Sequence, residues 1–195
     1  NIIDYLAIAT IGNASDFGDA TVSRQGGSGT ASTTRGLFGG GFTPSYSDVI
    51  DYITIGSTGN ASDFGDLTVA RGSYGNDASS ATRATFAGGQ KSSNSNVIDY
   101  ITIASTGNAN DFGDLEIITS SSSGSSNSTR GVYSGFNNTG ATGADGTFGN
   151  CPHISYITIA STGNSTDFGD LTHSPRGSSG RYAIAAASNG HGGLS

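Results

Sequence analysis

Acidic side chains recur in pairs along the chain, and paired carboxylates are groups that can bind a cation. Each pair holds two aspartates three residues apart within the block Gly-Asn-x-x-Asp-Phe-Gly-Asp, at Asp16/Asp19, Asp63/Asp66, Asp111/Asp114 and Asp167/Asp170. Oxygen-rich segments of this kind can hold Ca²⁺. The Asp-x-Asp-x-Asp-Gly loop pattern is absent, however, and fourfold repetition fits a turn-capping role. We therefore predict no cofactor, with Ca²⁺ as the alternative.

The residue types needed for catalysis do not form a recognisable set. The sequence has no Gly-x-Ser-x-Gly, phosphate loop or His-Glu-x-x-His motif, and the three histidines, His153, His173 and His191, stand at non-equivalent positions. A glycan-active enzyme would need carboxylates clustered in one cleft. We predict that the chain is not an enzyme, and keep glycan hydrolysis as an alternative.

Four near-copies of one segment position these residues. Asp4, Asp51, Asp99 and Ser155 mark equivalent points, at intervals of 47, 48 and 56 residues. A period in this range is typical of repeat architectures. We expect one repeat domain over residues 1–195, with repeats at approximately 20–66, 67–114 and 115–170, and a last repeat in which 171–195 joins 1–19.

One period has the composition of short strands and turns. β-branched and aromatic runs such as Arg83–Gly89 and Asn96–Ile103 alternate with clusters of Gly, Asn and Ser. No helical periodicity interrupts them. Four short antiparallel strands per repeat predict an all-β fold built from propeller blades.

The order of these residues resembles the kelch repeat. The resemblance rests on an Arg-Gly pair, a double glycine (Gly39-Gly40, Gly88-Gly89), a variable loop, Val-Ile-Asp-Tyr, and a late aromatic residue. Phe17, Phe64, Phe112 and Phe168 stand where kelch repeats have tryptophan, and Ser134-Gly135-Phe136 replaces the double glycine in the third repeat. The resemblance implies a kelch-like β-propeller, whose phenylalanines pack between blades.

A longer sequence pattern is also similar to repeats in structural and tail-fibre proteins of marine bacteriophages, especially cyanophages. The pattern is Ile-Thr-Ile-x-Ser-Thr-Gly-Asn-x-x-Asp-Phe-Gly-Asp-Leu-Thr. That resemblance implies a virion or other extracellular location.

The two chain ends are complementary in sequence. Arg181–Ala187 aligns with Arg83–Gly89, so the tail supplies a strand that the first repeat lacks. We expect four blades of about 48 residues with ring closure by the two termini, which protects sheet edges. Core candidates are Ile53, Ile55, Phe64, Leu67 and Phe86. We expect the periodic arginines, among them Arg24, Arg35, Arg71 and Arg83, to be hydrogen-bonding props between blades.

Charge and hydropathy exclude several partners. A net charge of −7 without a basic stripe predicts no nucleic-acid binding. No apolar run is long enough for a membrane span. Cys151 is the single cysteine, which rules out an intrachain disulfide.

Binding residues are expected where the repeats differ, because scaffold positions must match from blade to blade. The loops after the double glycine differ most and carry aromatic and amide groups suited to neutral sugars. The candidates are Phe42, Tyr46, Lys91, Asn137, Asn138 and His153. We predict a noncatalytic binding and structural module of an extracellular assembly, such as a phage fibre or virion surface contacting host glycans or neighbouring structural proteins. A purely structural oligomerisation module is the alternative.

Overall fold

The structure is a computed structural model of the 195-residue chain and describes residues 1–72, 77–138 and 149–171. For residues 137, 138 and 149–151 it describes the backbone alone. Within these ranges every regular element is a strand, which confirms the all-β prediction. None of the described residues forms a helix that could cross a membrane.

The strands follow one another as antiparallel meanders. In chain order they are β1 (Ile2–Tyr5), β2 (Ser15–Asp19), β3 (Ser28–Ala31), β4 (Arg35–Gly39), β5 (Val49–Thr54), β6 (Ser62–Asp66), β7 (Asp77–Ser79), β8 (Arg83–Ala87), β9 (Ser95–Thr102), β10 (Asn110–Thr119), β11 (Ser123–Ser126), β12 (Arg130–Asn138), β13 (Gly149–Thr158) and β14 (Thr166–Asp170).

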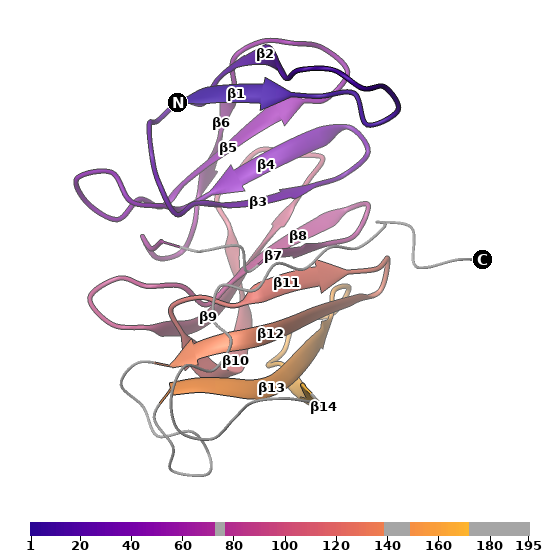
Figure 1. Ribbon diagram of the computed structural model, residues 1–195. Coiled ribbons are helices and arrows are strands. Elements are labelled where there is room, and N and C mark those ends of the chain that lie inside the picture. The colour runs from indigo at the N-terminus through magenta and orange to yellow at the C-terminus, as the bar shows by residue number, and fades with distance from the viewer. Residues whose placement is uncertain (73–76, 139–148, 172–195) are drawn as a thin grey trace.

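The described strands form three four-stranded sheets and one two-stranded sheet. The larger sheets have the orders β3-β4-β5-β6, β7-β8-β9-β10 and β11-β12-β13-β14, and β1 pairs with β2 alone. Figure 1 shows the sheets stacked in chain order, with β1–β2 at one end and β14 at the other. The closed four-bladed ring stays a prediction, because residues 172–195, expected to close it, lie outside the described residues.

The Asp-Phe-Gly-Asp segments are edge strands, which corrects their interpretation as turns. They form β2, β6, β10 and β14. In β6 the register passes from Asp51↔Asp63 to Ile50↔Gly65, so Phe64 lies in a bulge and Gly65 has φ 142°. The local capping is retained within the strand, since the Asp111 carboxylate accepts a 3.1 Å bond from the Gly113 N–H. Bulged edge strands are common where pairing ends.

The hydrophobic core lies between successive sheets. Phe64 is 2% exposed and packs with Ile101 and Ile103 of the following sheet. Phe112 packs in the same way against Ile157 and Ile159. These contacts confirm, for Phe64 and Phe112, that the phenylalanines pack between successive sheets, whereas Phe168 is 54% exposed.

One core expectation is wrong. Ile55 is 45% exposed, although its counterparts Ile103 and Ile159 are buried. The counterparts are covered by four-stranded sheets, whereas the sheet preceding Ile55 has only β1 and β2 in the described residues.

Truncation of Phe64 tests this packing against a matched control. Phe64→Ala should lower the free energy of unfolding by about 3–5 kcal/mol, the usual cost of removing a buried phenylalanine. Phe168 is the equivalent residue of β14 but is 54% exposed. In dilute solution, Phe168→Ala should cost under about 1 kcal/mol. Equal costs in urea melts would show that the two positions are equally buried.

The short inner strands β3, β7 and β11 pack backbone against backbone. A Cβ on Gly124 would lie 2.1 Å from the Asp77 carbonyl oxygen, so only glycine fits there. The Ser79 hydroxyl donates to the Ala31 carbonyl at 2.9 Å, and the Ser79 N–H donates to the Ser126 hydroxyl at 3.0 Å. Close approach therefore requires the glycine at position 124 of β11.

Asp77 is buried in this contact. Burial raises the pKa of its carboxyl from 3.8 to about 7, although the Ser28 hydroxyl and the Arg71 charge oppose the shift. Neither carboxyl oxygen has a hydrogen-bond partner of good geometry in the described part of the chain.

The raised pKa of Asp77 predicts a pH-dependent stability. Between the unfolded pKa of 3.8 and the folded pKa of about 7, the folded state binds more protons than the unfolded state. The contribution of Asp77 is therefore fully present below about pH 4 and is lost as the pH rises through about 7, by up to about 4 kcal/mol. Asp77→Asn should remove this dependence. Parallel urea melts at several pH values check it, and identical pH profiles for the two proteins would contradict it.

Candidate functional site

Most of the repeated residues are used to join one sheet to the next. The loop between the third and fourth strands of each sheet docks on the edge strand of the preceding sheet. For the β9–β10 loop, the Gly107 N–H donates to the Phe64 carbonyl at 2.7 Å and the Ala109 N–H donates to the Asp66 carbonyl at 2.8 Å. The Asp66 N–H donates to the Asn108 side-chain oxygen at 3.1 Å. We call this three-bond arrangement the clasp.

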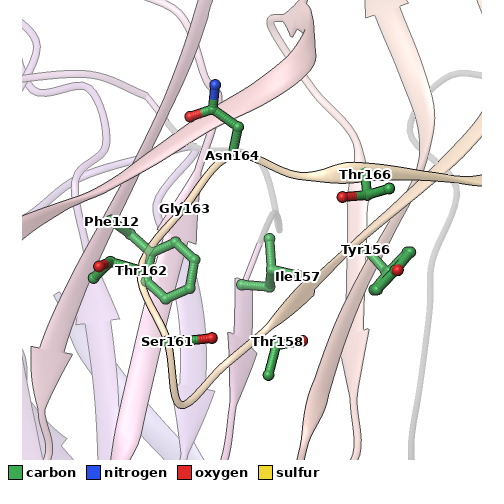
Figure 2. Close-up of a pocket in the computed structure, with 9 residues that line it drawn as sticks. All are labelled: Phe112, Tyr156, Ile157, Thr158, Ser161, Thr162, Gly163, Asn164 and Thr166. Carbon is green, nitrogen blue, oxygen red and sulfur yellow. The ribbon is translucent and has the colours of Figure 1, made fainter.

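The same clasp occurs at three steps of the stack. Residues 59–61 dock on β2, 107–109 on β6, and 163–165 on β10. Figure 2 shows the third clasp, where residues of the 161–164 loop line a pocket of about 170 Å³ together with Phe112 and Ile157. Because this pocket is part of the framework joining the sheets, we do not assign it a ligand.

Buried arginines reinforce two of the four-stranded sheets, β3–β6 and β7–β10. The side chain of Arg71 is fully buried, lies 2.8 Å from the Asp99 carboxylate and donates to the Phe86 carbonyl at 3.0 Å. Thr68 donates to the same carboxylate at 2.5 Å. Arg24 forms the equivalent ion pair with Asp51.

A second set of arginines connects neighbouring sheets. The guanidinium of Arg83 lies over the Tyr100 ring at 4.3 Å and donates to the Ile159 carbonyl at 2.9 Å. Arg35 lies over Tyr52 and donates to the Ile103 carbonyl at 2.6 Å. The prediction that periodic arginines join successive repeats is confirmed for these two. It is wrong for Arg24 and Arg71, whose side chains bond within their own sheets.

The Arg71–Asp99 pair gives a direct test of the framework. Asp99→Asn leaves the Arg71 charge buried without its counterion, and should cost about 3–5 kcal/mol of stability. In the third repeat, residues 115–170, the corresponding residues are Thr119 and Ser155. The double variant Arg71→Thr/Asp99→Ser should therefore be more stable than Asp99→Asn alone. Thermal and urea unfolding measure both, and a double variant less stable than the single one would contradict this account.

The third repeat, residues 115–170, lacks this buried ion pair and has a different group of side chains at other framework positions. Glu116 and His153 stand at the positions of Thr68 and Val97, and Phe136 stands where the first two four-stranded sheets have Gly41 and Gly89. His153 Nε2 lies 2.9 Å from Glu116 Oε2, and His153 Nδ1 lies 3.7 Å from Asp167 Oδ1. The Phe136 ring lies 5.9 Å from the imidazole. We call these four residues the His153 cluster.

The His153 cluster places groups that bind hydroxyls beside the Phe136 ring, which is fully buried in the core. His153 is half-buried, while Glu116 and Asp167 are exposed and can accept hydrogen bonds from a ligand. Among the described residues, no group of three or more His, Cys, Asp or Glu side chains is arranged to hold a metal ion.

The other sequence candidates lie in separate groups. Phe42 and Tyr46 contact each other edge-to-face at 5.2 Å in the β4–β5 loop, where Phe42 also pairs with Gln25 through the backbone. Lys91 is exposed in the β8–β9 loop. Asn137 and Asn138 pair with Asn150 and Gly149 across β12 and β13.

The structure thus brings Phe42 to Tyr46, and gives His153 partners that the candidate set lacked. In the described part of the chain, no hydrogen bond, ion pair or ring contact joins these groups to one another or to Lys91. Sequence reasoning missed Gln25, Glu116 and Asp167. A signal for Glu116 was present, because it is the single glutamate of the chain and replaces a repeated threonine.

No protein-family model matches the chain, and a search of curated proteins finds no similar sequence.

Proposed function

We propose that this protein is a noncatalytic binding module of an extracellular assembly, of the phage-fibre or virion-surface kind, and that it contacts neutral glycans. The observation that carries the proposal is that the third repeat, residues 115–170, has different side chains at several positions that match in the two repeats before it. There Thr119 and Ser155 stand at the positions of the buried Arg–Asp pair, and the partly exposed His153 cluster stands at other framework positions. A framework position is expected to change in one copy alone where a different task is served.

The candidate groups share one edge of the stack. In Figure 1 the β4–β5 and β8–β9 loops emerge on the same side of the sheets, and β13, which carries His153, starts on that side. The Phe42–Tyr46 pair offers aromatic surface for stacking, and the His153 cluster offers polar groups for sugar hydroxyls. The net charge of −7 disfavours polyanionic partners. The resemblance to phage structural repeats supports the extracellular setting.

The proposed architecture is a kelch-like β-propeller, with four blades per chain and closure where the chain termini meet. Two features of the two-stranded β1–β2 sheet support the proposal that further strands pair with β1 on its inner side. A hollow of about 530 Å³ lies between β1 and β3, lined by residues that include Asp4 and Arg24. Asp4 is exposed, whereas its equivalents Asp51 and Asp99 are buried.

Loop variants with matched controls test the binding proposal. On a glycan array and on host cells, Tyr46→Ala and Glu116→Gln should each weaken binding at least about tenfold, the effect of losing one good contact. Tyr5→Ala is the control for Tyr46, because Tyr5 also contacts a phenylalanine edge-to-face, at 5.8 Å. Asp63→Asn is the control for Glu116. Both controls should bind within about twofold of the parent, with all melting temperatures monitored.

Three results would contradict the proposal. Absence of any glycan ligand would favour the purely structural oligomerisation module. Equal losses in test and control variants would place the site elsewhere. Release of sugars from host polysaccharide would show an enzyme.

A further inference from the structure

The stack of sheets ends in an unmatched half of a clasp. Phe168 of β14 is 54% exposed, whereas the equivalent Phe64 and Phe112 are buried under the next sheet. A Cβ on Gly65 would lie 2.5 Å from the backbone of Gly107, but a Cβ on Gly169 would meet nothing within 4 Å. The β14 strand therefore resembles the edge strand of a clasp, but no loop docks on it in the described part of the chain.

The opposite end of the stack presents the complementary half. Gly12 and Asn13 occupy the positions of the docking residues Gly107 and Asn108, but in the described part of the chain neither Gly12 nor Ala14 donates an N–H to an edge strand as Gly107 and Ala109 do. Ile8 is 96% exposed, although its equivalents Ile103 and Ile159 are buried. Residues 8–14 therefore have the form of a clasp turn without its edge strand.

Arg130 adds an independent sign of the same missing contact. Its guanidinium lies over the Tyr156 ring at 4.7 Å, as Arg35 and Arg83 lie over their tyrosines. Those two arginines donate to the carbonyls of Ile103 and Ile159 in the next sheet. In the described part of the chain, the Arg130 guanidinium has no such carbonyl. In the last repeat, where residues 171–195 are expected to join 1–19, the residue equivalent to Ile103 and Ile159 is Ile8.

We propose that these two end surfaces bind each other between two copies of the chain, head to tail. Residues 8–14 of one copy would dock on β14 of the other, with Gly12 and Ala14 donating to the Phe168 and Asp170 carbonyls. The Asn13 side chain accepts from the Asp170 N–H, and Arg130 donates to the Ile8 carbonyl. The partner's turn also covers Phe168 and buries Ile8.

The positions of the two surfaces favour a second copy as the occupant. They lie at opposite ends of the molecule in Figure 1, and the three internal clasps use the same bonds at each step. If the same arrangement is repeated once more, another Gly-Asn loop docks on β14. A second copy of the chain can supply that loop with its residues 8–14. A contact between two different surfaces is heterologous, and it makes a ring or an extended chain. This proposal rests on the proposed propeller architecture but changes its closing contact, because the two termini that meet come from two copies and not from one chain.

Sedimentation velocity over a range of protein concentrations tests the association without any ligand. The parent protein should assemble with rising concentration. Ile8→Asp places a charge in the contact and should raise the apparent dissociation constant at least about tenfold, because burying an unpaired charge is costly. Ser92→Asp adds the same charge in the exposed β8–β9 loop and should change it less than about twofold.

Crosslinking identifies the surfaces involved. Asn13→Cys and Asp170→Cys are prepared as separate proteins, each also carrying Cys151→Ser, then mixed and treated with a short bis-maleimide. A crosslinked heterodimer is expected. A parent protein that stays monomeric, association unaffected by Ile8→Asp, or a crosslink that forms only within a chain carrying both cysteines would overturn the proposal. The last result would show that the chain closes on itself.

Discussion

The clasp between successive sheets is the contact on which the rest of this structure depends. A loop from one sheet places two N–H donors and an asparagine oxygen on the edge strand of the sheet before it. The approach is so close that a Cβ on Gly18, Gly65 or Gly113 would lie within 2.4–2.6 Å of the docked backbone. Those glycines also have φ of 141–148°, a conformation that other residues rarely adopt. The clasp sets the spacing at which phenylalanines and isoleucines of adjacent sheets fill the core.

This constraint separates framework from variable surface. The Gly-Asn turns, the Phe-Gly-Asp edges and the Arg–Tyr contacts recur because each copy must match its neighbour. Asn60 and Asn164 accept bonds of this framework from the Asp19 and Asp114 N–H groups. The third repeat, residues 115–170, keeps its clasp and its Arg130–Tyr156 contact but lacks the buried ion pair. Thr119 and Ser155 stand at the positions of that pair, and elsewhere in the same repeat the Glu116 and Asp167 carboxylates of the His153 cluster are exposed.

Sequence periodicity was sufficient to predict the strands, the burial of Phe64 and the bridging arginines Arg35 and Arg83. These features repeat locally, so one copy indicates the others. The clasp could not be predicted, because Gly107-Asn108 reads as a local turn while its partners, Phe64 and Asp66, lie more than 40 residues earlier. The same limit applies to the site: His153 was a candidate, but its contact with Glu116 joins β13 to β10 across 37 residues. Ile55 was misjudged because its burial depends on the sheet before it, which periodicity does not describe.

Native-state hydrogen exchange at single amides tests the clasp most directly. The Gly107 and Gly163 N–H groups donate across the sheet boundary, whereas Gly12 has the same sequence context but no clasp partner in the described part of the chain. In dilute solution, where chains are separate, the account predicts that the Gly107 and Gly163 amides exchange only through large-scale opening, with protection close to that of the core strands. The Gly12 amide should exchange at nearly the rate of an unstructured peptide. Rapid exchange at all three amides would show that the sheets are not held together by the clasp, and would contradict the account.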